Sequence, residues 1–355
     1  MTQNETWSRY VDEDWLGSNQ EPILDAEIPI VDPHHHLWAW PFPYEMAETL
    51  ADLSTGHKVQ ATVHVEAHGH YRAEGPQHLR PVGETEYVAN QACRVDQARC
   101  PTNVCAGIVG HADVTRGASI EEVLGAHIEA AQGRFRGIRI NVYWTMTRDN
   151  SPWTPSPVRS LLEEPPIFEA LGCLARHDLS CDLVAFHSNL PDVARTALAF
   201  EETVFIVNHM GAPMTPDDQP DEHALARVWR GHIDQLARCQ NVRMKLGGWL
   251  NPMLSRSIPS VAALRRLPVG PSSEQTAAAL RPYVNYCIER FGPDRCMFES
   301  NFPVDKNFTR YATLWNAYKR LASEYSQHER RALLGGTAAA VYRIDFGSEK
   351  HDQFH

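Results

Sequence analysis

The segment HVEAHGH, at residues 64–70, carries a side chain that can bind a metal ion at every second position. These side chains are His64, Glu66, His68 and His70. Imidazole and carboxylate groups are the ligands that zinc, manganese, iron and nickel use in proteins, and carboxylates favour the harder ions. The segment therefore predicts a metal site with more ligands than a single hydrolytic ion requires.

Further groups of the same kind follow other β-rich segments. His34 and His36 in the motif DPHHH stand two residues apart, so in an extended chain both side chains point to the same side. The other candidates stand at or just beyond the ends of later β-rich segments, and they are His187, His209, Glu299, Asn301 and Asp305. A single histidine is more often structural than a ligand, but this many at strand ends favours a metal centre.

Strand alternation separates the members of HVEAHGH. Because the residues before Glu66 read as a strand, His64 lies on the same face as Glu66 but one layer deeper, where we expect a supporting role. Glu66 stands at the strand end and is the expected bridge between two metal ions. His68 and His70 lie beyond the strand, and the glycine before His70 lets the chain fold back over a site. We therefore expect His68 and His70 to be additional ligands.

Short β-rich runs alternate with longer helical patterns along most of the chain. The eight strand candidates are residues 28–32, 61–66, 104–110, 137–142, 181–186, 203–208, 241–247 and 296–300. The clearest helical patterns are residues 84–98, 119–133, 165–178, 190–200, 222–239 and 273–292. This alternation predicts a (β/α)8 TIM barrel, in which the ends of all strands converge on one pocket. A doubly wound open sheet is the competing fold, but no GxGxxG motif follows any strand.

The chain divides into one barrel domain, residues 28–344, with a polar N-terminal arm, residues 1–27, and a polar C-terminal tail, residues 345–355. Two segments rich in Pro, Ser and Trp, residues 144–165 and 249–273, read as long loops after the fourth and seventh strands. In a barrel such loops lie at the catalytic mouth.

Composition excludes several classes of function. The formal net charge of −11 argues against binding to nucleic acid or to an anionic membrane surface. The eight cysteines form no CxxC pair, which is typical of reduced thiols in a cytoplasmic protein. No apolar run reaches the length of a membrane span, and no signal segment is visible at the N-terminus. We therefore expect a cytoplasmic protein whose partner is a small-molecule substrate.

Three further residues are candidates for substrate binding. Arg139 and Tyr143 stand at the end of the fourth strand, and Arg139 can hold a carboxylate with two hydrogen bonds. A surface salt bridge is an equally good interpretation of Arg139. Lys245 on the seventh strand is expected to bind a substrate carboxylate or to pair with Glu299, because an unpaired buried lysine is costly.

Several motifs resemble those of the amidohydrolase superfamily, in the branch of amidohydrolase-related proteins that includes lactonases of small molecules. They are VDPHHHLW, RPVGETEYV, CAGIVGHAD, GRFRGIR, NHMGAP, KLGG and MFESNFPVDK, and the resemblance extends from about residue 28 to residue 344. It implies a metal-dependent barrel with His34, His36, His187 and His209 near the site.

The chain departs from that family at two places. Hydrolases of the superfamily have a metal-binding aspartate at the end of the eighth strand that accepts a proton from water, whereas this chain has Asn301, and an amide cannot be a general base. Glu299 or Asp305 would have to replace it. The second departure is EAHGHYR, which adds His68 and His70 beside Glu66.

The surplus of ligands resembles a small group of this superfamily, the dinuclear iron or manganese/iron monooxygenases. One of its members is a two-component enzyme that hydroxylates α-aminoisobutyrate, and the chain is similar to its metal-bearing subunit. On this interpretation Glu66, Glu299 and Asn301 belong to the catalytic centre, two Fe or Mn ions bind O2, and an unactivated C–H bond is hydroxylated. It also implies an electron donor and a hetero-oligomer with a homologous subunit, or a homo-oligomer.

Two alternatives remain open. The first is a metal-dependent hydrolase or lactonase, with zinc, that acts on a small carboxylated lactone or amide. The second is a catalytically silent subunit that supports an active homologue, which the abundance of ligands argues against.

Overall fold

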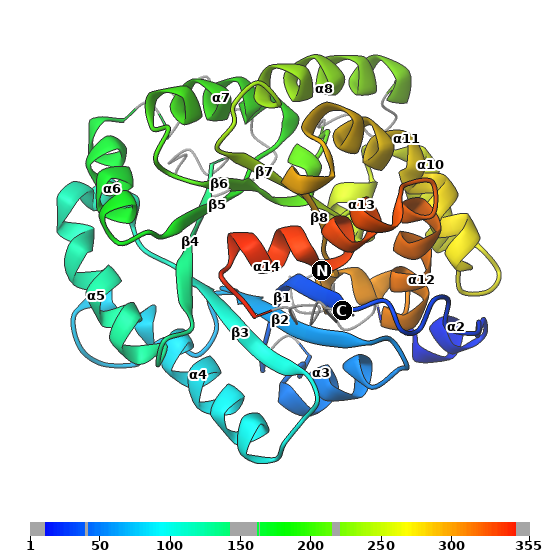
Figure 1. Ribbon diagram of the computed structural model, residues 1–355, viewed down its shortest axis with the longest axis horizontal. Coiled ribbons are helices and arrows are strands. Elements are labelled where there is room, and N and C mark those ends of the chain that lie inside the picture. Colours follow the sequence, from blue (N-terminus) through cyan, green and yellow to red (C-terminus); the bar gives the residue numbers. More distant parts are fainter. Residues whose placement is uncertain (1–10, 40–41, 143–161, 163, 215–220, 346–355) are drawn as a thin grey trace, which may run out of the picture.

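Eight parallel strands form the centre of the computed structural model, which describes residues 11–39, 42–142, 162, 164–214 and 221–345 (Figure 1). The strands are β1 (Ile30–His35), β2 (Val59–Val65), β3 (Asn103–Gly110), β4 (Phe135–Asn141), β5 (Ser180–Val184), β6 (Phe205–Val207), β7 (Val242–Leu246) and β8 (Cys296–Phe298). Each pairs with the next in chain order. This confirms the predicted (β/α)8 barrel, and each strand overlaps its expected range.

The two ends of the sheet meet between β1 and the segment that follows β8. The backbone N–H of Asn301 donates to the carbonyl of His34 at 2.8 Å, and the N–H of His36 donates to the carbonyl of Phe302 at 2.8 Å. Asp32 strengthens this seam, because its carboxylate accepts from the backbone N–H of Ser300 at 3.0 Å. The closure brings the HxH pair of β1 beside the end of β8.

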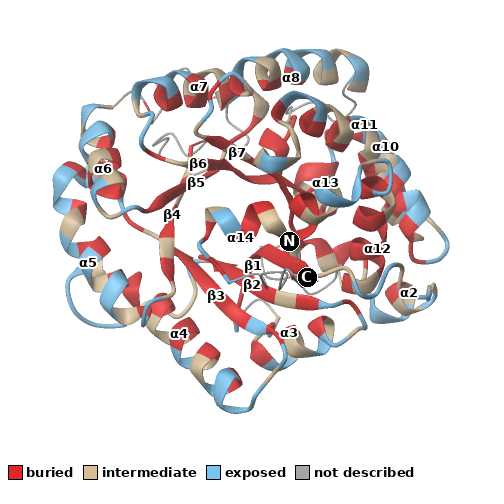
Figure 2. Ribbon diagram, viewed as in Figure 1, coloured by how far each residue is buried: buried red, intermediate tan, exposed pale blue. Residues whose placement is uncertain are grey.

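Helices surround the barrel (Figure 1). The main ones are α3 (Met46–Leu53), α4 (Val82–Gln97), α5 (Glu121–Ala130), α6 (Pro165–Arg176), α7 (Leu190–Ala199), α8 (Glu222–Leu236), α11 (Ser273–Phe291) and α12 (Tyr311–Ala322). Shorter helices are α2 (Glu13–Gly17), α9 (Pro252–Ser255), α10 (Pro259–Ala262), α13 (Gln327–Arg331) and α14 (Thr337–Val341). Figure 2 shows that the strands are buried along most of their length, while the helices expose their outer faces.

The hydrophobic core has two parts. The larger part fills the space between the sheet and the helices, and the smaller part lies inside the barrel. Val31, Val63 and Met297 belong to the inner part, together with Tyr342 from the turn that follows α14. In Figure 1 α14 lies in the middle of the ring of strands. The last helix therefore completes the interior of the barrel.

Residues 11–27 pack against the barrel. The indole N–H of Trp15, in α2, donates to the carbonyl of Leu267 at 3.0 Å. The ammonium of Lys319, in α12, donates to the carbonyls of Leu24 and Asp25 at 2.9 Å each. Trp15 was a sign of such docking in the sequence, whereas the Lys319 contacts use backbone carbonyls, so the side chains of Leu24 and Asp25 give no sign of them.

The segment 249–273 is more ordered than predicted, because it contains the short helices α9 and α10. Most of the other expected loop, residues 144–165, lies outside the described residues, as does the tail beyond residue 345. None of the eight cysteines forms a disulfide. Among the described helices, none is both long enough and apolar enough to cross a lipid bilayer.

Candidate metal centre and active site

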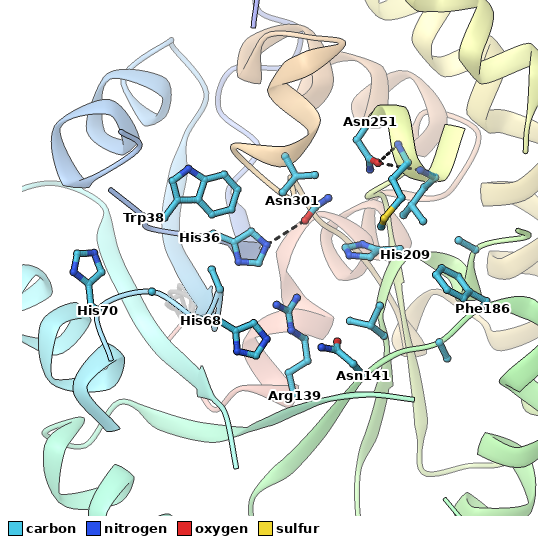
Figure 3. Close-up of a pocket in the computed structure, with 18 of the residues that line it drawn as sticks. His36, Trp38, His68, His70, Arg139, Asn141, Phe186, His209, Asn251 and Asn301 are labelled. Carbon is cyan, nitrogen blue, oxygen red and sulfur yellow. Dashed lines mark hydrogen bonds between the residues drawn. The ribbon is translucent and has the colours of Figure 1, made fainter. Parts of the chain in front are cut away.

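A cavity of about 640 Å³ opens where the strands end. Six of the predicted site residues line it, namely His36, His68, His70, Arg139, His209 and Asn301. In Figure 3 His36, Arg139, His209 and Asn301 lie around the same part of the cavity, whereas His70 lies farther away. The cavity therefore lies at the strand ends, where (β/α)8 barrels carry their catalytic groups.

His34, His209 and Glu299 form a compact cluster at the base of this cavity. The nitrogen Nδ1 of His34 lies 2.6 Å from Oε2 of Glu299, and Nδ1 of His209 lies 2.7 Å from Oε1. All three residues are buried, and one ligand atom from each lies within 4.8 Å of the others. Two imidazoles and one carboxylate at this spacing can hold a divalent metal ion.

Backbone conformation, as well as side-chain chemistry, builds this cluster. His209 has φ of 56°, and its own N–H donates to Oε1 of Glu299 at 3.1 Å. A Cβ atom at Gly248 would lie 1.9 Å from Nδ1 of His209, and one at Gly247 would lie 2.5 Å from the carbonyl oxygen of Glu299. The two glycines of the KLGG motif therefore make room for the two ligands.

Burial keeps the imidazole of His34 neutral. Desolvation lowers the pKa of His34 well below its usual value, and the nearby charge of Lys245 lowers it further. Lys245 itself is fully buried and pairs with Asp182 at 2.7 Å. Tyr342 donates to the same carboxylate of Asp182, at 3.0 Å and 3.1 Å from its two oxygens. A neutral imidazole presents a lone pair, which is the form that binds metal.

His36 and Asn301 present two hydrogen-bond acceptors to one another. The nitrogen Nδ1 of His36 lies 2.7 Å from the carbonyl of Val65, which can only accept, so Nδ1 carries the proton. Burial lowers the pKa of His36 well below its usual value, so Nε2 carries a lone pair. That nitrogen lies 3.3 Å from Oδ1 of Asn301, whose Nδ2 donates to Asp305 at 2.9 Å.

Two acceptors in contact are satisfied by a cation or by a water molecule that donates to both. Oε2 of Glu299 is also a buried acceptor without a hydrogen bond of good geometry among the described residues, despite its short contact with His34. These unpartnered lone pairs fit a divalent metal ion, which the fold family implies. His34, His209 and Glu299 are the residues placed to hold it, with His36 and Asn301 beside them.

Glu66, the expected bridge between two ions, makes an ion pair with Arg139. Nε of Arg139 lies 2.8 Å from Oε1 of Glu66, and NH1 of Arg139 lies 3.4 Å from Nε2 of His34. Burial alone would raise the pKa of Glu66, but Arg139, His68 and His111 lower it, so the group is ionised. A guanidinium group thus contacts both Glu66 and His34.

The structure does not bring the remaining predicted ligands to this cluster. The ring of His70 stacks on Tyr87, and its Nε2 lies 3.2 Å from Glu45. Nδ1 of His187 accepts from the backbone N–H of Met214 at 3.1 Å. Lys245 pairs with Asp182 and not with Glu299. Tyr143 lies outside the described residues.

Two residues of the site were missed in the sequence. His111 directly follows β3 and joins Glu66 and His68 in a second group of metal-type side chains. Its position immediately after a strand in CAGIVGHAD was a signal of the same kind as those of His187 and His209. Asp182 lies within β5, and its pairing with Lys245 across the barrel has no local signal.

Comparisons with known proteins agree with this architecture. The amidohydrolase family model matches residues 31–344. An uncharacterized protein of Sinorhizobium fredii, y4mH, is 29% identical over 348 residues, which are 90% of this chain and 100% of that protein. An L-fucono-1,5-lactonase of Burkholderia multivorans is 27% identical, with 88% of this chain and 96% of that protein covered.

Solved structures show the same fold. A zinc-bound amidohydrolase of Burkholderia multivorans superimposes with a TM-score of 0.67 at 22% identity, and the match covers 89% of this chain and 99% of that one. A putative 2-pyrone-4,6-dicarboxylic acid hydrolase of Pseudomonas putida gives a TM-score of 0.60 at 17% identity, with 90% and 99% covered. The expected superfamily is confirmed, and the family model covers most of the chain: the protein belongs to the amidohydrolase family.

Proposed function

We propose that the protein is a metal-dependent hydrolase that opens a small lactone. The observation that carries this proposal is the buried cluster of His34, His209 and Glu299 at the base of the cavity. The L-fucono-1,5-lactonases among the relatives, 27% and 25% identical to this chain, support it independently. These relatives favour hydrolysis over the expected O2-dependent hydroxylation.

The residues around the cluster suit attack of water on an ester carbonyl. A bound divalent ion such as zinc polarises a carbonyl group and lowers the pKa of its water to about 7. His36 and Asn301 offer two acceptors 3.3 Å apart, so they orient a water molecule by accepting hydrogen bonds from its two O–H groups. Nε2 of His36 is then the atom that takes the proton as the water oxygen bonds to the carbonyl carbon, in place of the aspartate that Asn301 replaces. The same nitrogen returns the proton to the ring oxygen as the bond between that oxygen and the carbonyl carbon breaks, which gives the open hydroxy acid.

Arg139 contributes a fixed positive charge to the cavity wall. Its guanidinium is held by the side chain of Glu66 at 2.8 Å and also by the Glu66 carbonyl. A donor held in place in this way stabilises the negative charge that develops on the carbonyl oxygen of the ester. Because Arg139 already has an anionic partner, we propose a neutral lactone as substrate and not the carboxylated one first expected.

The other walls of the cavity are mainly apolar. Trp38, Phe186, Met253 and Leu254 line it. Aromatic and aliphatic walls bind the C–H face of a ring, while a few polar groups fix its orientation. A cavity of about 640 Å³ accommodates a ring of monosaccharide size.

Hydrolysis of lactones under anaerobic conditions tests the proposal. The zinc-loaded full chain is mixed with L-fucono-1,5-lactone and with a panel of simple five- and six-membered lactones, and acid release is followed with a pH indicator. We expect turnover of at least one lactone without O2, and loss of that turnover in His36→Ala. The control is Glu324→Gln on the surface, where Glu324 pairs with Arg281. Acid release at the uncatalysed rate for every lactone would refute the proposal.

The full chain, loaded with iron and manganese in place of zinc, tests the oxygenase interpretation. That interpretation depended on His68 and His70 as additional ligands and on Glu66 as the bridge between two ions. His70 pairs with Glu45, and Glu66 gives one carboxylate oxygen to Arg139, which separates it from His34. Iron- and manganese-loaded protein is placed in an oxygen electrode with a reductant and with α-aminoisobutyrate. Substrate-dependent O2 uptake would favour the oxygenase, whereas our proposal predicts none.

A further inference from the structure

Glu66, His68 and His111 form a second group of metal-type side chains, beside the substrate cavity. One ligand atom from each residue lies within 4.8 Å of the others, and the group shares no residue with His34, His209 and Glu299. Glu66 directly follows β2 and His111 directly follows β3. A smaller cavity of about 370 Å³, lined by His68, His111 and Arg139, opens beside the group.

Two buried atoms of this group lack a hydrogen-bond partner. The side chain of Glu66 is only 1% exposed, and its Oε2 has no hydrogen bond among the described residues. Its other oxygen, Oε1, accepts from Nε of Arg139 at 2.8 Å. Nδ1 of His111 is likewise buried without a partner among them. A buried carboxylate oxygen without a hydrogen bond is costly, so Oε2 of Glu66 favours a cation beside it.

The spacing of the group matches the coordination of a small divalent ion. Zinc lies about 2.0–2.2 Å from nitrogen and oxygen ligands, so two ligands of a tetrahedral site are about 3.4 Å apart. Nδ1 of His68 lies 3.5 Å from Oε2 of Glu66. We propose that Oε2 of Glu66, His68 and His111 bind a second divalent transition-metal ion, with water in the remaining position.

The contacts of Glu66 and His68 define how this ion is accommodated. Glu66 gives one oxygen to Arg139 and the other to the ion, so Arg139 separates this site from His34, which its NH1 contacts at 3.4 Å. The two ions are therefore not bridged by Glu66. Nδ1 of His68 also forms a 2.8 Å hydrogen bond with the hydroxyl of Tyr71. Binding of the ion to Nδ1 would replace this hydrogen bond.

The ion would fix one wall of the substrate cavity. His68 lines both cavities and lies in the loop after β2, where it has φ of 58°. Its side chain is 49% exposed, and the hydrogen bond from Tyr71 comes from the same loop. An ion bound by His68, Glu66 and His111 together would hold this loop against the ends of β2 and β3. The inference concerns binding of a metal and does not rest on lactone hydrolysis.

Zinc stoichiometry of the full chain tests this site. The protein is stripped with a chelator, reloaded with Zn²⁺ and separated from free ion, and the bound zinc is counted by mass spectrometry. We expect two ions per wild-type chain, one per chain in His68→Ala and in His111→Ala, and one in His209→Ala. The double variant His68→Ala/His209→Ala should bind none.

His70→Ala is the matched control, because His70 lies in the same loop and pairs with Glu45 outside the group, so it should keep both ions. If His111→Ala fails to fold, His68→Ala decides, since its side chain is half exposed. Equal zinc in His68→Ala and wild type would overturn the inference. If the wild type binds a single ion that His68→Ala loses and His209→Ala keeps, the inference is supported. The same result would contradict a metal ion at His34, His209 and Glu299, and with it the proposed hydrolase.

Discussion

Glu299 contacts two imidazoles of the candidate metal centre at once. Because its two oxygens lie 2.6 Å from His34 and 2.7 Å from His209, the neutral amide in Glu299→Gln removes both charge-assisted contacts. We expect zinc affinity and lactone turnover to fall by at least about 100-fold, because Glu299 is itself placed to hold the ion and residues that only support ligands already contribute about 10–100-fold. Metal content and kcat/KM are measured together. Full zinc content with full turnover would contradict the role of Glu299.

Asp305 gives the stability of the fold a characteristic pH dependence. Burial raises the pKa of its carboxyl group from 3.8 to about 7, against the lowering effect of the hydrogen bond from Asn301. The folded chain holds this proton up to about pH 7, whereas the unfolded chain releases it near pH 3.8. The stabilisation is therefore complete below pH 3.8 and is lost as the pH rises through 7.

Asp305→Asn should remove this dependence. The metal-free wild type is expected to lose up to about 4 kcal/mol of unfolding free energy between about pH 4 and pH 7, relative to the variant. The change is nearly isosteric. Because one amide oxygen cannot accept from both the N–H of Leu250 and Nδ2 of Asn301, the variant is less stable at every pH, and the slope with pH is the quantity to compare. Urea unfolding across this pH range measures the difference. Parallel stability curves for the two proteins would show that Asp305 does not hold its proton.

At the scale of residues, the positions of side chains could be predicted within the strands but not in the loops that follow them. The i, i+2 spacing of His34 and His36 was sufficient to place both at the cavity, because strand alternation fixes the side of the sheet. His68 and His70 have φ of 58° and 52°, a conformation that sequence alone does not indicate for histidine. That backbone turns His70 toward Glu45, so a count of possible ligands overstated the number near His34.

At the scale of elements, the turn after β7 controls the metal centre. Gly248 has φ of +76°, and a Cβ there would lie 1.9 Å from Nδ1 of His209. Gly248→Ala should therefore displace His209, lower the zinc content and cost about 1–3 kcal/mol of stability. Gly125→Ala is the control, since nothing lies within 4 Å of its Cβ in α5, and it should stabilise by about 0.4–1 kcal/mol. Thermal unfolding and metal analysis of both variants check this, and equal zinc in the two would contradict it.

The strands were predictable as elements, but the short helices were not. Short segments rich in buried β-branched residues, such as VQATVHV in β2, give a strong strand signal, and all eight strands were found. Helices α9 and α10 have four residues each, which is too short for a helical hydrophobic period to emerge. The side chain of Asn251 caps α9 by accepting from the N–H groups of Met253 and Leu254. A proline begins each of the two helices.

At the scale of the whole molecule, metal binding should stabilise the folded chain. The clustered ligands exist only when β1, β6 and β8 are assembled, so an ion binds the folded state in preference to the unfolded state. Chelation is expected to lower the Tm, and free Zn²⁺ at about 100 times its Kd should restore about 2.7 kcal/mol. Differential scanning calorimetry with and without chelator measures this. The double variant His68→Ala/His209→Ala should not respond, and an unchanged wild-type Tm would contradict metal-linked stability.

Tyr342 links the end of the chain to the interior of the barrel. It stands near the C-terminus of the 355-residue chain, yet its hydroxyl donates to Asp182, the partner of Lys245. Removing this hydroxyl would leave Oδ2 of the buried Asp182 carboxylate without its 3.1 Å donor, which costs about 1–3 kcal/mol. The ion pair inside the barrel is therefore fully satisfied only when the segment that follows α14 is docked against the strands.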